Sequence, residues 1–120
     1  MFRLIAAAAL LLYALRVEAD SPGWFGFSIG VDVSVLMNLK SATINHVFSP
    51  SPAERAGIAV GDEIIEVEGC KIPGCGAYKA KHLLEKSVGE IVNLRLRRSN
   101  GEEYAVALKA EAEPKSTATP

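Results

Sequence analysis

Apolar residues occupy every second position in three stretches of the chain, which are residues 25–35, 92–96 and 104–108. A period of two is typical of a strand that buries one face, so each stretch predicts a β-strand. Asn100-Gly101 lies between the last two stretches and is a strong signal for a tight turn, which predicts a β-hairpin over residues 91–108. Two shorter apolar stretches, at 43–48 and 64–67, predict further strands.

Two segments have the features of helices. Ser51 can cap a short helix, because Pro52 occupies its first position and Glu54 follows three residues after the cap. Gly57 can adopt the left-handed conformation that ends this helix. A second helix is predicted over residues 77–87, where apolar side chains recur at spacings of three and four. The predicted fold is α+β, a small, partly open β-barrel or sandwich of about five or six strands capped by two helices.

The N-terminal segment has the layout of a leader. In residues 1–19, Arg3 precedes an apolar run at 4–15, and small or moderate residues follow it up to Ala19. This layout predicts a signal peptide that is cleaved after Ala19, and the run is shorter than the ~20 residues that span a bilayer. Retention of the segment as a membrane anchor is the alternative.

The C-terminal residues 111–120 are polar and include two prolines. They show no apolar spacing, so we expect them to form a disordered tail. The predicted folded domain is therefore residues 20–110, which is long enough for one hydrophobic core.

The composition favours no charged partner. The chain has 13 Lys and Arg against 14 Asp and Glu residues, a formal net charge of −1 at pH 7. Without a strong field we expect no nucleic-acid partner, and membrane contact only if residues 1–19 are retained. The basic stretch 95–98 alternates with apolar residues and predicts the solvated face of a strand. No cofactor is expected.

Residues 26–30 read Gly-Phe-Ser-Ile-Gly, which matches the G-x-S-x-G pattern of esterases. In those enzymes the serine lies on a sharp turn between a strand and a helix. Here the alternation of a strand continues beyond Ser28, and neither His46 nor His82 lies in a recognisable triad motif. We therefore expect Ser28 to be a strand residue and the chain not to be an enzyme.

Cys70 and Cys75 lie in a segment rich in turn residues. In an exported protein a disulfide is the default state of such a pair, and it would fix the approach to the second helix. A redox-active pair is an alternative, although its cysteines are usually separated by two residues. A zinc site would need further ligands such as His46 or His82, and no metal is expected.

Residues 49–69 read SPSPAERAGIAVGDEIIEVEG. A serine-proline-alanine helix start, an alanine-glycine-aliphatic exit, a glycine-aspartate turn and a strand that ends in a glycine turn follow one another here. This stretch closely resembles a PDZ domain, and the resemblance extends over roughly residues 23–110. Few residues precede the candidate binding loop, so the chain resembles the bacterial, circularly permuted form of periplasmic trypsin-like stress proteases. In that form a C-terminal strand, here 104–108, fills the place of the missing first strand.

The resemblance implies a peptide-binding site, because PDZ domains bind the free C-terminus of a partner as an added strand. Residues 24–27 match the carboxylate-binding loop of the family, in which the N–H groups of Phe25, Gly26 and Phe27 would hold the carboxylate. We expect a β-branched residue in place of Gly26 to abolish binding and to leave the fold largely intact. The implied peptide-binding residues are Trp24, Phe25, Gly26, Phe27, Ser28, Ile29, Tyr78, His82 and Leu83.

Alternatives stay open for this site. The aromatic residues of the loop could fill the core of a domain that has lost binding. In many PDZ domains a histidine at the start of the second helix contacts the partner. Tyr78 lies nearer to that place than His82, which is otherwise an exposed helix residue. The predicted function is a non-catalytic module, periplasmic or secreted, that binds a protein or peptide partner. The alternative is a structural or docking component of a membrane-associated or periplasmic assembly that binds no C-terminal peptide.

Overall fold

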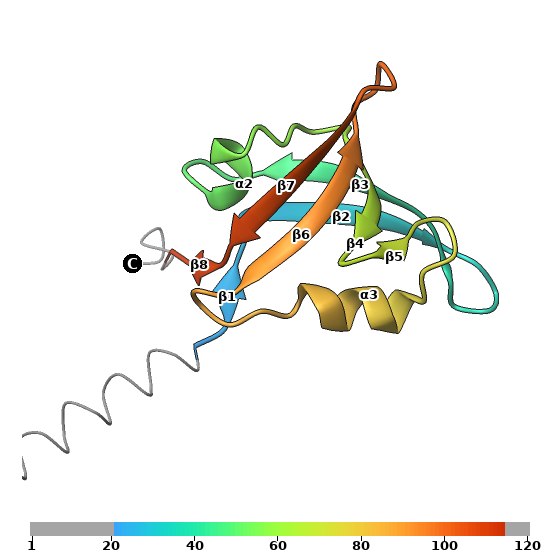
Figure 1. The fold of residues 1–120 in the computed structure, drawn as a ribbon, viewed down its shortest axis with the longest axis horizontal. Coiled ribbons are helices and arrows are strands. Elements are labelled where there is room, and N and C mark those ends of the chain that lie inside the picture. The colour runs from blue at the N-terminus through green and yellow to red at the C-terminus, as the bar shows by residue number, and fades with distance from the viewer. Residues whose placement is uncertain (1–20, 115–120) are drawn as a thin grey trace, which may run out of the picture.

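The computed structural model describes residues 21–114. The predicted signal peptide, and residues 115–120 of the predicted tail, lie outside this part of the chain. The elements, in chain order, are β1 (Gly23–Trp24), β2 (Phe27–Val33), β3 (Leu39–Val47), α2 (Pro52–Arg55), β4 (Glu63–Val67), β5 (Cys70–Lys71), α3 (Ala77–Leu84), β6 (Ile91–Arg97), β7 (Glu103–Lys109) and β8 (Glu111–Ala112) (Figure 1).

One antiparallel sheet dominates the fold. Its strands lie in the order β2-β3-β4-β6-β7, and the short β5 pairs with β4. The predicted hairpin is confirmed, because β6 and β7 pair with Val92 opposite Leu108 and Leu96 opposite Tyr104. β7 lies at the edge of the sheet beside β6. Figure 1 shows α2 and α3 well apart, at different borders of the curved sheet, and both contribute residues to one core. The α+β prediction is confirmed, with an open sheet rather than a closed barrel.

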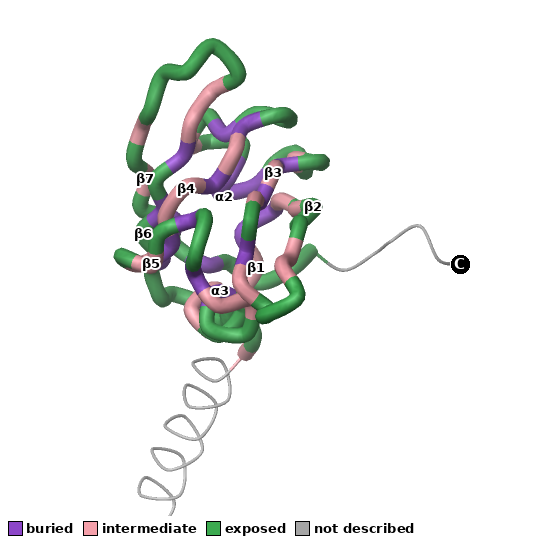
Figure 2. The backbone as a smooth tube through the Cα atoms, turned by 90° about the vertical axis from the view of Figure 1, so that its right-hand side faces the viewer, coloured by how far each residue is buried: buried purple, intermediate pink, exposed green. Residues whose placement is uncertain are grey.

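The core follows the period-two pattern of the sequence. Along β6 the residues alternate between exposed and buried, and Leu94 and Leu96 point inward together with Ile44 and Ile64 of the neighbouring strands. Figure 2 shows buried positions along the strands and exposed positions on the loops that project from them. β6 therefore buries one face, and alternation predicted three of the longer strands, β2, β6 and β7.

The predicted N-cap of α2 at Ser51 is confirmed, without the return bond from the Glu54 side chain that would complete a capping box. The Ser51 backbone is extended (φ −160°), its hydroxyl accepts a hydrogen bond from the Glu54 N–H at 3.1 Å, and Pro52 is the first helical residue. Gly57 follows the helix with a φ of +84°. Ser51 itself is fully buried, at 0% exposure, so the start of α2 is part of the packed interior.

Helix α3 is shorter than predicted. It ends at Leu84 and does not include Ser87. The cause is tertiary pairing, because the Gly23 N–H donates to the Lys86 carbonyl at 2.7 Å and Pro22 forms an antiparallel bridge with Ser87. The chain after Leu84 therefore pairs with the N-terminal segment and does not extend the helix.

The two ends of the domain pair with each other. β1 and β8 form a separate two-stranded antiparallel sheet, in which Trp24 lies opposite Glu111. Arg55 of α2 forms an ion pair with Glu111. Glu111 and Ala112 therefore belong to the folded part, although they fall within the stretch that we expected to be a disordered tail. No helix in residues 21–114 is long and apolar enough to cross a membrane.

A buried carboxylate joins the β6–β7 hairpin to the loop after α2. The Asp62 carboxylate accepts hydrogen bonds from the Ala59 N–H at 3.1 Å, from the Arg98 guanidinium at 2.6 Å and from the Tyr104 hydroxyl. The Arg98 guanidinium also lies 4.0 Å from the centre of the Tyr104 ring. Arg98 therefore differs from the rest of its basic stretch, which we predicted to be solvated.

Tyr104→Phe tests this cluster. Burial and the hydrogen bond to Asp62 raise the pKa of the Tyr104 hydroxyl above its ordinary value of 10.0. The folded state thus favours the neutral phenol, and this contribution to stability is full below about pH 10 and is lost as the pH rises further. We expect the variant to lose about 1.5 kcal/mol of unfolding free energy at neutral pH. Urea unfolding should show a smaller difference from the wild type at about pH 11 than at about pH 7. A difference that does not change with pH would contradict this assignment.

Candidate functional site

The loop before β2 lies directly against the start of α2. Gly26 has a φ of +83°, and a Cβ atom at this position would lie 2.1 Å from the Cβ of Ser51 and 2.5 Å from its Oγ. Ser51 is held in place, because its hydroxyl donates to the Phe48 carbonyl at 2.7 Å while it caps α2. Position 26 therefore requires glycine for two reasons, which are its backbone angle and its contact with Ser51.

The carbonyl groups of this loop are hydrogen-bonded, whereas two of its amide groups have no partner among the described residues. The Phe25 carbonyl accepts from the Ala53 N–H at 2.9 Å, and the Gly26 carbonyl accepts from the Phe48 N–H at 2.8 Å. The N–H groups of Phe25 and Gly26 donate to no acceptor within residues 21–114. Consecutive available N–H groups can bind an anion such as a carboxylate. Carboxylate binding by this loop stays a prediction, and the geometry is compatible with it.

An apolar groove of about 430 Å³ lies between β2 and α3. Ile29 and Val31 form its β2 side, and Ala77, Lys81 and Leu84 share the face of α3 that lines it. Its floor consists of the core residues Leu39, Ala42, Ile64 and Val67. β2 is the last strand of its sheet, so within the described residues its outer edge pairs with no other strand. An extended segment could pair with this edge and place alternate side chains in the groove.

The aromatic residues of the loop pack differently from the expected ligand pocket. Phe25 is buried in the core, and its ring stacks on that of Phe27 with ring centres 6.3 Å apart. The Trp24 ring packs against Phe48, with centres 5.9 Å apart. Of the loop and β2 residues predicted to line a pocket for a partner's last side chain, Ile29 lines the open groove, and Phe25 and Phe27 do not.

The groove-facing side of α3 also differs from the predicted one. Tyr78 is 73% exposed, and neither Tyr78 nor the exposed His82 lines the groove. Leu83 packs against the core. Ala77, one residue before Tyr78, is the first residue of α3 that lines the groove. A role of Tyr78, His82 or Leu83 in peptide binding stays a prediction, and the geometry favours the face that begins at Ala77.

Ser28 is a strand residue. Its hydroxyl donates to the side-chain oxygen of Asn45 at 2.5 Å, and an amide oxygen is not a general base. His46 lies opposite Ser28 on β3, but its ring packs edge-on against Phe48 with ring centres 4.3 Å apart. β2 continues to Val33, so the helix that a nucleophile elbow requires does not follow Ser28. This arrangement offers no support for a hydrolase.

Cys70 and Cys75 form a disulfide, with their Cα atoms 5.4 Å apart. The bridged segment leads into α3 and bonds to the β2–β3 loop. The Leu39 N–H donates to the Cys75 carbonyl at 2.7 Å, and the Ala77 N–H donates to the Met37 carbonyl at 2.8 Å. The disulfide therefore belongs to the structure that holds the start of α3 beside the β2–β3 loop, at one end of the groove.

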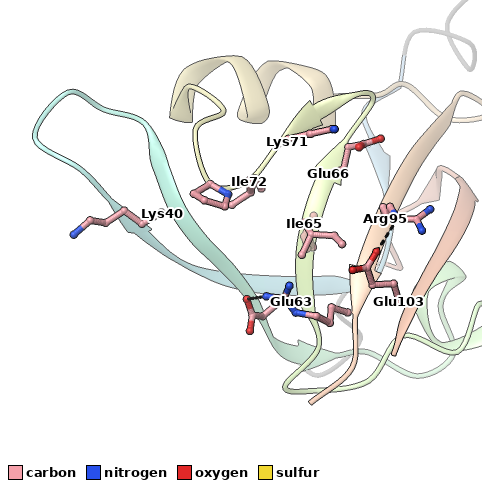
Figure 3. A pocket seen from close by; sticks show the side chains of 11 residues that line it. Lys40, Glu63, Ile65, Glu66, Lys71, Ile72, Arg95 and Glu103 are labelled. Atoms are coloured by element: carbon pink, nitrogen blue, oxygen red, sulfur yellow. Dashed lines mark hydrogen bonds and ion pairs between the residues drawn. The ribbon is translucent and has the colours of Figure 1, made fainter. Parts of the chain in front are cut away.

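A second hollow, of about 460 Å³, lies on the outer face of β4 and β6. Figure 3 shows a lining of mainly charged side chains. Arg95 pairs with Glu103 at 3.2 Å and Arg97 pairs with Glu63 at 3.3 Å. These half-exposed charges pair with one another, so this hollow does not offer the apolar lining that the groove has. Among residues 21–114, no group of three or more His, Cys, Asp or Glu side chains could hold a metal ion.

An open sheet with a glycine loop before its edge strand, and a helix beside that strand, defines the class of this domain. The model of the PDZ domain family matches residues 14–97, and the chain belongs to the PDZ family. It is 36% identical over 85 residues to the Patj homolog of Drosophila melanogaster, a match that covers 70% of this chain and 10% of that protein. It is 39% identical over 51 residues, 42% of this chain, to the chloroplastic carboxyl-terminal-processing peptidase 3 of Arabidopsis thaliana, of which it covers 10%. The chain thus spans about a tenth of the length of these two curated relatives.

Solved structures share the fold at low identity. The photosystem II D1 C-terminal processing protease superposes with a TM-score of 0.64 at 23% identity, over 81% of this chain and 25% of that chain. The PDZ domain of the carboxy-terminal protease of Vibrio cholerae, solved with a peptide, gives 0.51 at 19% identity, over 72% and 94%. The HtrA3 PDZ domain, bound to the phage-derived ligand FGRWV, gives 0.55 at 22%, over 74% and 85%. At these identities the likenesses show the fold, and the bacterial type stays a prediction.

The contact between Gly26 and Ser51 corrects one expectation from the sequence. A β-branched residue in place of Gly26 was expected to leave the fold largely intact. Any Cβ at this position would overlap a buried side chain that caps α2. That expectation is wrong, because such a substitution would disturb the fold together with the loop.

We expect Gly26→Ala to lower the unfolding free energy by about 3 kcal/mol. The left-handed backbone contributes ~1–2 kcal/mol of this loss and the overlap with Ser51 contributes ~1–3 kcal/mol. Gly61→Ala is the matched control, because Gly61 has a φ of +94° but no atom within 4 Å of an added Cβ. Gly61→Ala should lower the unfolding free energy by the backbone contribution alone. Equal losses for the two variants in urea unfolding would show that the contact with Ser51 has no energetic weight.

Proposed function

We propose that this chain is a non-catalytic module that binds extended peptide segments, most often free C-termini with an apolar last residue, by adding them as a strand to β2. One observation carries the proposal. The outer edge of β2 is open beside an apolar groove, and available N–H groups of Phe25 and Gly26 lie where β2 begins. The PDZ fold supports it, since neighbours with this fold were solved with peptides.

The direction of such a ligand follows from the position of its C-terminus. With its carboxylate at the loop before β2, the added strand runs antiparallel to β2. Its last side chain then lies near Ile29 and Leu84, and the side chain two residues earlier lies near Val31 and Ala77, because alternate residues share one face of a strand. These four residues are apolar, so the proposed ligand has apolar residues at both positions.

We propose no catalytic step for this chain. Ser28 is bonded to Asn45, and its neighbour His46 packs on an aromatic ring. We also propose export, because a disulfide persists in oxidising compartments and because residues 1–19 read as a signal peptide. N-terminal sequencing of the exported chain should begin at Asp20. A chain that begins at Met1 would show that the segment is kept.

One observation favours the alternative of a docking component that binds no C-terminal peptide. Phe25 and Phe27 stack on each other and do not line the groove, so the space nearest the loop is partly filled by the protein's own rings. In that case the groove would accept an internal segment, or another surface would make the contact. The test below separates these cases.

Peptide binding tests the proposal. The purified chain is titrated with a library of peptides that have free C-termini and with the same peptides in amidated form. We expect binding to the free-acid peptides that is at least about tenfold tighter, since the carboxylate would bind the loop N–H groups. Equal affinity for both forms would show that an internal segment is bound. If no peptide binds, the result would favour the docking component.

A matched pair of variants locates the binding surface. Val31 lines the groove and is 51% exposed, so Val31→Asp should preserve the fold and weaken peptide binding at least about tenfold by placing a charge in the apolar groove. Val60 is similarly exposed but lies outside the groove, and Val60→Asp should bind like the wild type. Unchanged affinity of Val31→Asp would exclude this groove.

A further inference from the structure

Exposed apolar side chains gather beyond one end of the groove. In residues 21–114 the large apolar side chains that are exposed include five from the β2–β3 hairpin and the start of α3, which are Val31, Val35, Leu36, Met37 and Tyr78. Val35 is 98% exposed and Leu36 is 79% exposed. Single exposed apolar residues are common, but several that adjoin one another mark an interaction site. We call Val35, Leu36 and Met37 the apolar tip.

The apolar tip has a fixed backbone. The Ser34 N–H donates to the Asn38 carbonyl at 2.9 Å, and the Met37 N–H donates to the Ser34 carbonyl at 2.9 Å, so the turn is closed on itself. Met37 has a φ of 64°, an unfavourable angle for a residue with a side chain. Its carbonyl accepts from the Ala77 N–H at 2.8 Å, which joins the tip to the first turn of α3. The fold thus holds these side chains out in solvent.

The tip is continuous with the groove. Val31 lines the groove and is itself exposed, and Ala77, which also lines it, is bonded to Met37 of the tip and precedes Tyr78. Figure 1 shows the β2–β3 loop projecting beyond the first turn of α3. A segment that leaves the groove at this end therefore meets apolar side chains before it reaches solvent.

We propose that the apolar tip, together with Tyr78, binds the upstream part of the same extended segment that occupies the groove. The inference rests on the proposed function. An antiparallel strand with its carboxylate at the loop before β2 runs toward Val33 and then toward the tip. Two paired strands rise by the same distance per residue, so the seven residues of β2 lie beside about seven residues of the ligand. The tip therefore selects apolar side chains about five to eight residues before the ligand's C-terminus.

This occupant fits the observations better than a bilayer or a second copy of the chain. The exposed side chains extend from the tip into the groove through Val31, whereas insertion into a bilayer would use the tip alone. A few aliphatic side chains without a second anchor give only marginal membrane binding. A ligand strand needs no second anchor on the protein, because it reaches the tip by continuing along β2.

The test is a display selection of random ten-residue peptides with free C-termini on the full chain. We expect enrichment of apolar residues near the C-terminus and, separately, about five to eight residues upstream of it. For a selected peptide, Leu36→Ser should weaken binding about tenfold, equivalent to about 1.4 kcal/mol. The last five residues of that peptide alone should bind wild type and Leu36→Ser equally. Val60→Ser, a change at another exposed apolar site away from the groove, should leave both affinities unchanged.

The outcomes separate the two proposals. Enrichment confined to the last four residues, or affinity unaffected by Leu36→Ser, would overturn the role of the tip and leave peptide binding in the groove intact. Failure to select any peptide would overturn both. Sedimentation with phosphatidylcholine and phosphatidylglycerol vesicles, or dimerisation in analytical ultracentrifugation, would reveal another occupant if it depended on Leu36 and no upstream preference were found. That result would also overturn the inference.

Discussion

The contact between Gly26 and Ser51 is the constraint on which the arrangement of the site depends. Ser51 is buried, caps α2 and bonds to the end of β3, while Gly26 lies against it without a side chain. The carbonyls of Phe25 and Gly26 accept from the N–H groups of Ala53 and Phe48. Three elements therefore meet at this loop, and the amides of Phe25 and Gly26 donate to no acceptor within residues 21–114.

The other end of the groove is held by a separate set of contacts. The disulfide between Cys70 and Cys75 closes the segment before α3, and backbone hydrogen bonds join that segment to Met37 and Leu39. With both ends fixed, the groove exists before any ligand arrives. A preformed site loses less conformational entropy on binding, which favours affinity for short extended segments. The hydrogen bond from the Ala77 N–H to the Met37 carbonyl also joins the apolar tip to the start of α3.

Local patterns predicted the longer strands, the β6–β7 hairpin and the cap at Ser51, because each depends on neighbours in sequence, whereas the two-residue strands β1, β5 and β8 were not predicted. The features that escaped prediction depend on contacts between distant segments. Ser51 meets Gly26 across 25 residues, and no local pattern marks that contact. The groove-facing side of α3 begins at Ala77, a small residue that carries little apolar signal. The family resemblance implied Leu83 instead, which packs on the core. Lys86 pairs with Gly23, and this long-range bond shortened the helix.

Nuclear magnetic resonance of the backbone amides tests the central claim most directly. The ¹⁵N-labelled chain is titrated with a free-acid peptide that ends in an apolar residue and with its amidated form. We expect the amide resonances of Phe25 and Gly26 to move strongly with the free acid and much less with the amide, while those of β2 move with both. Identical shifts for the two peptides, or shifts confined to the outer face of β6 and β7, would contradict the account.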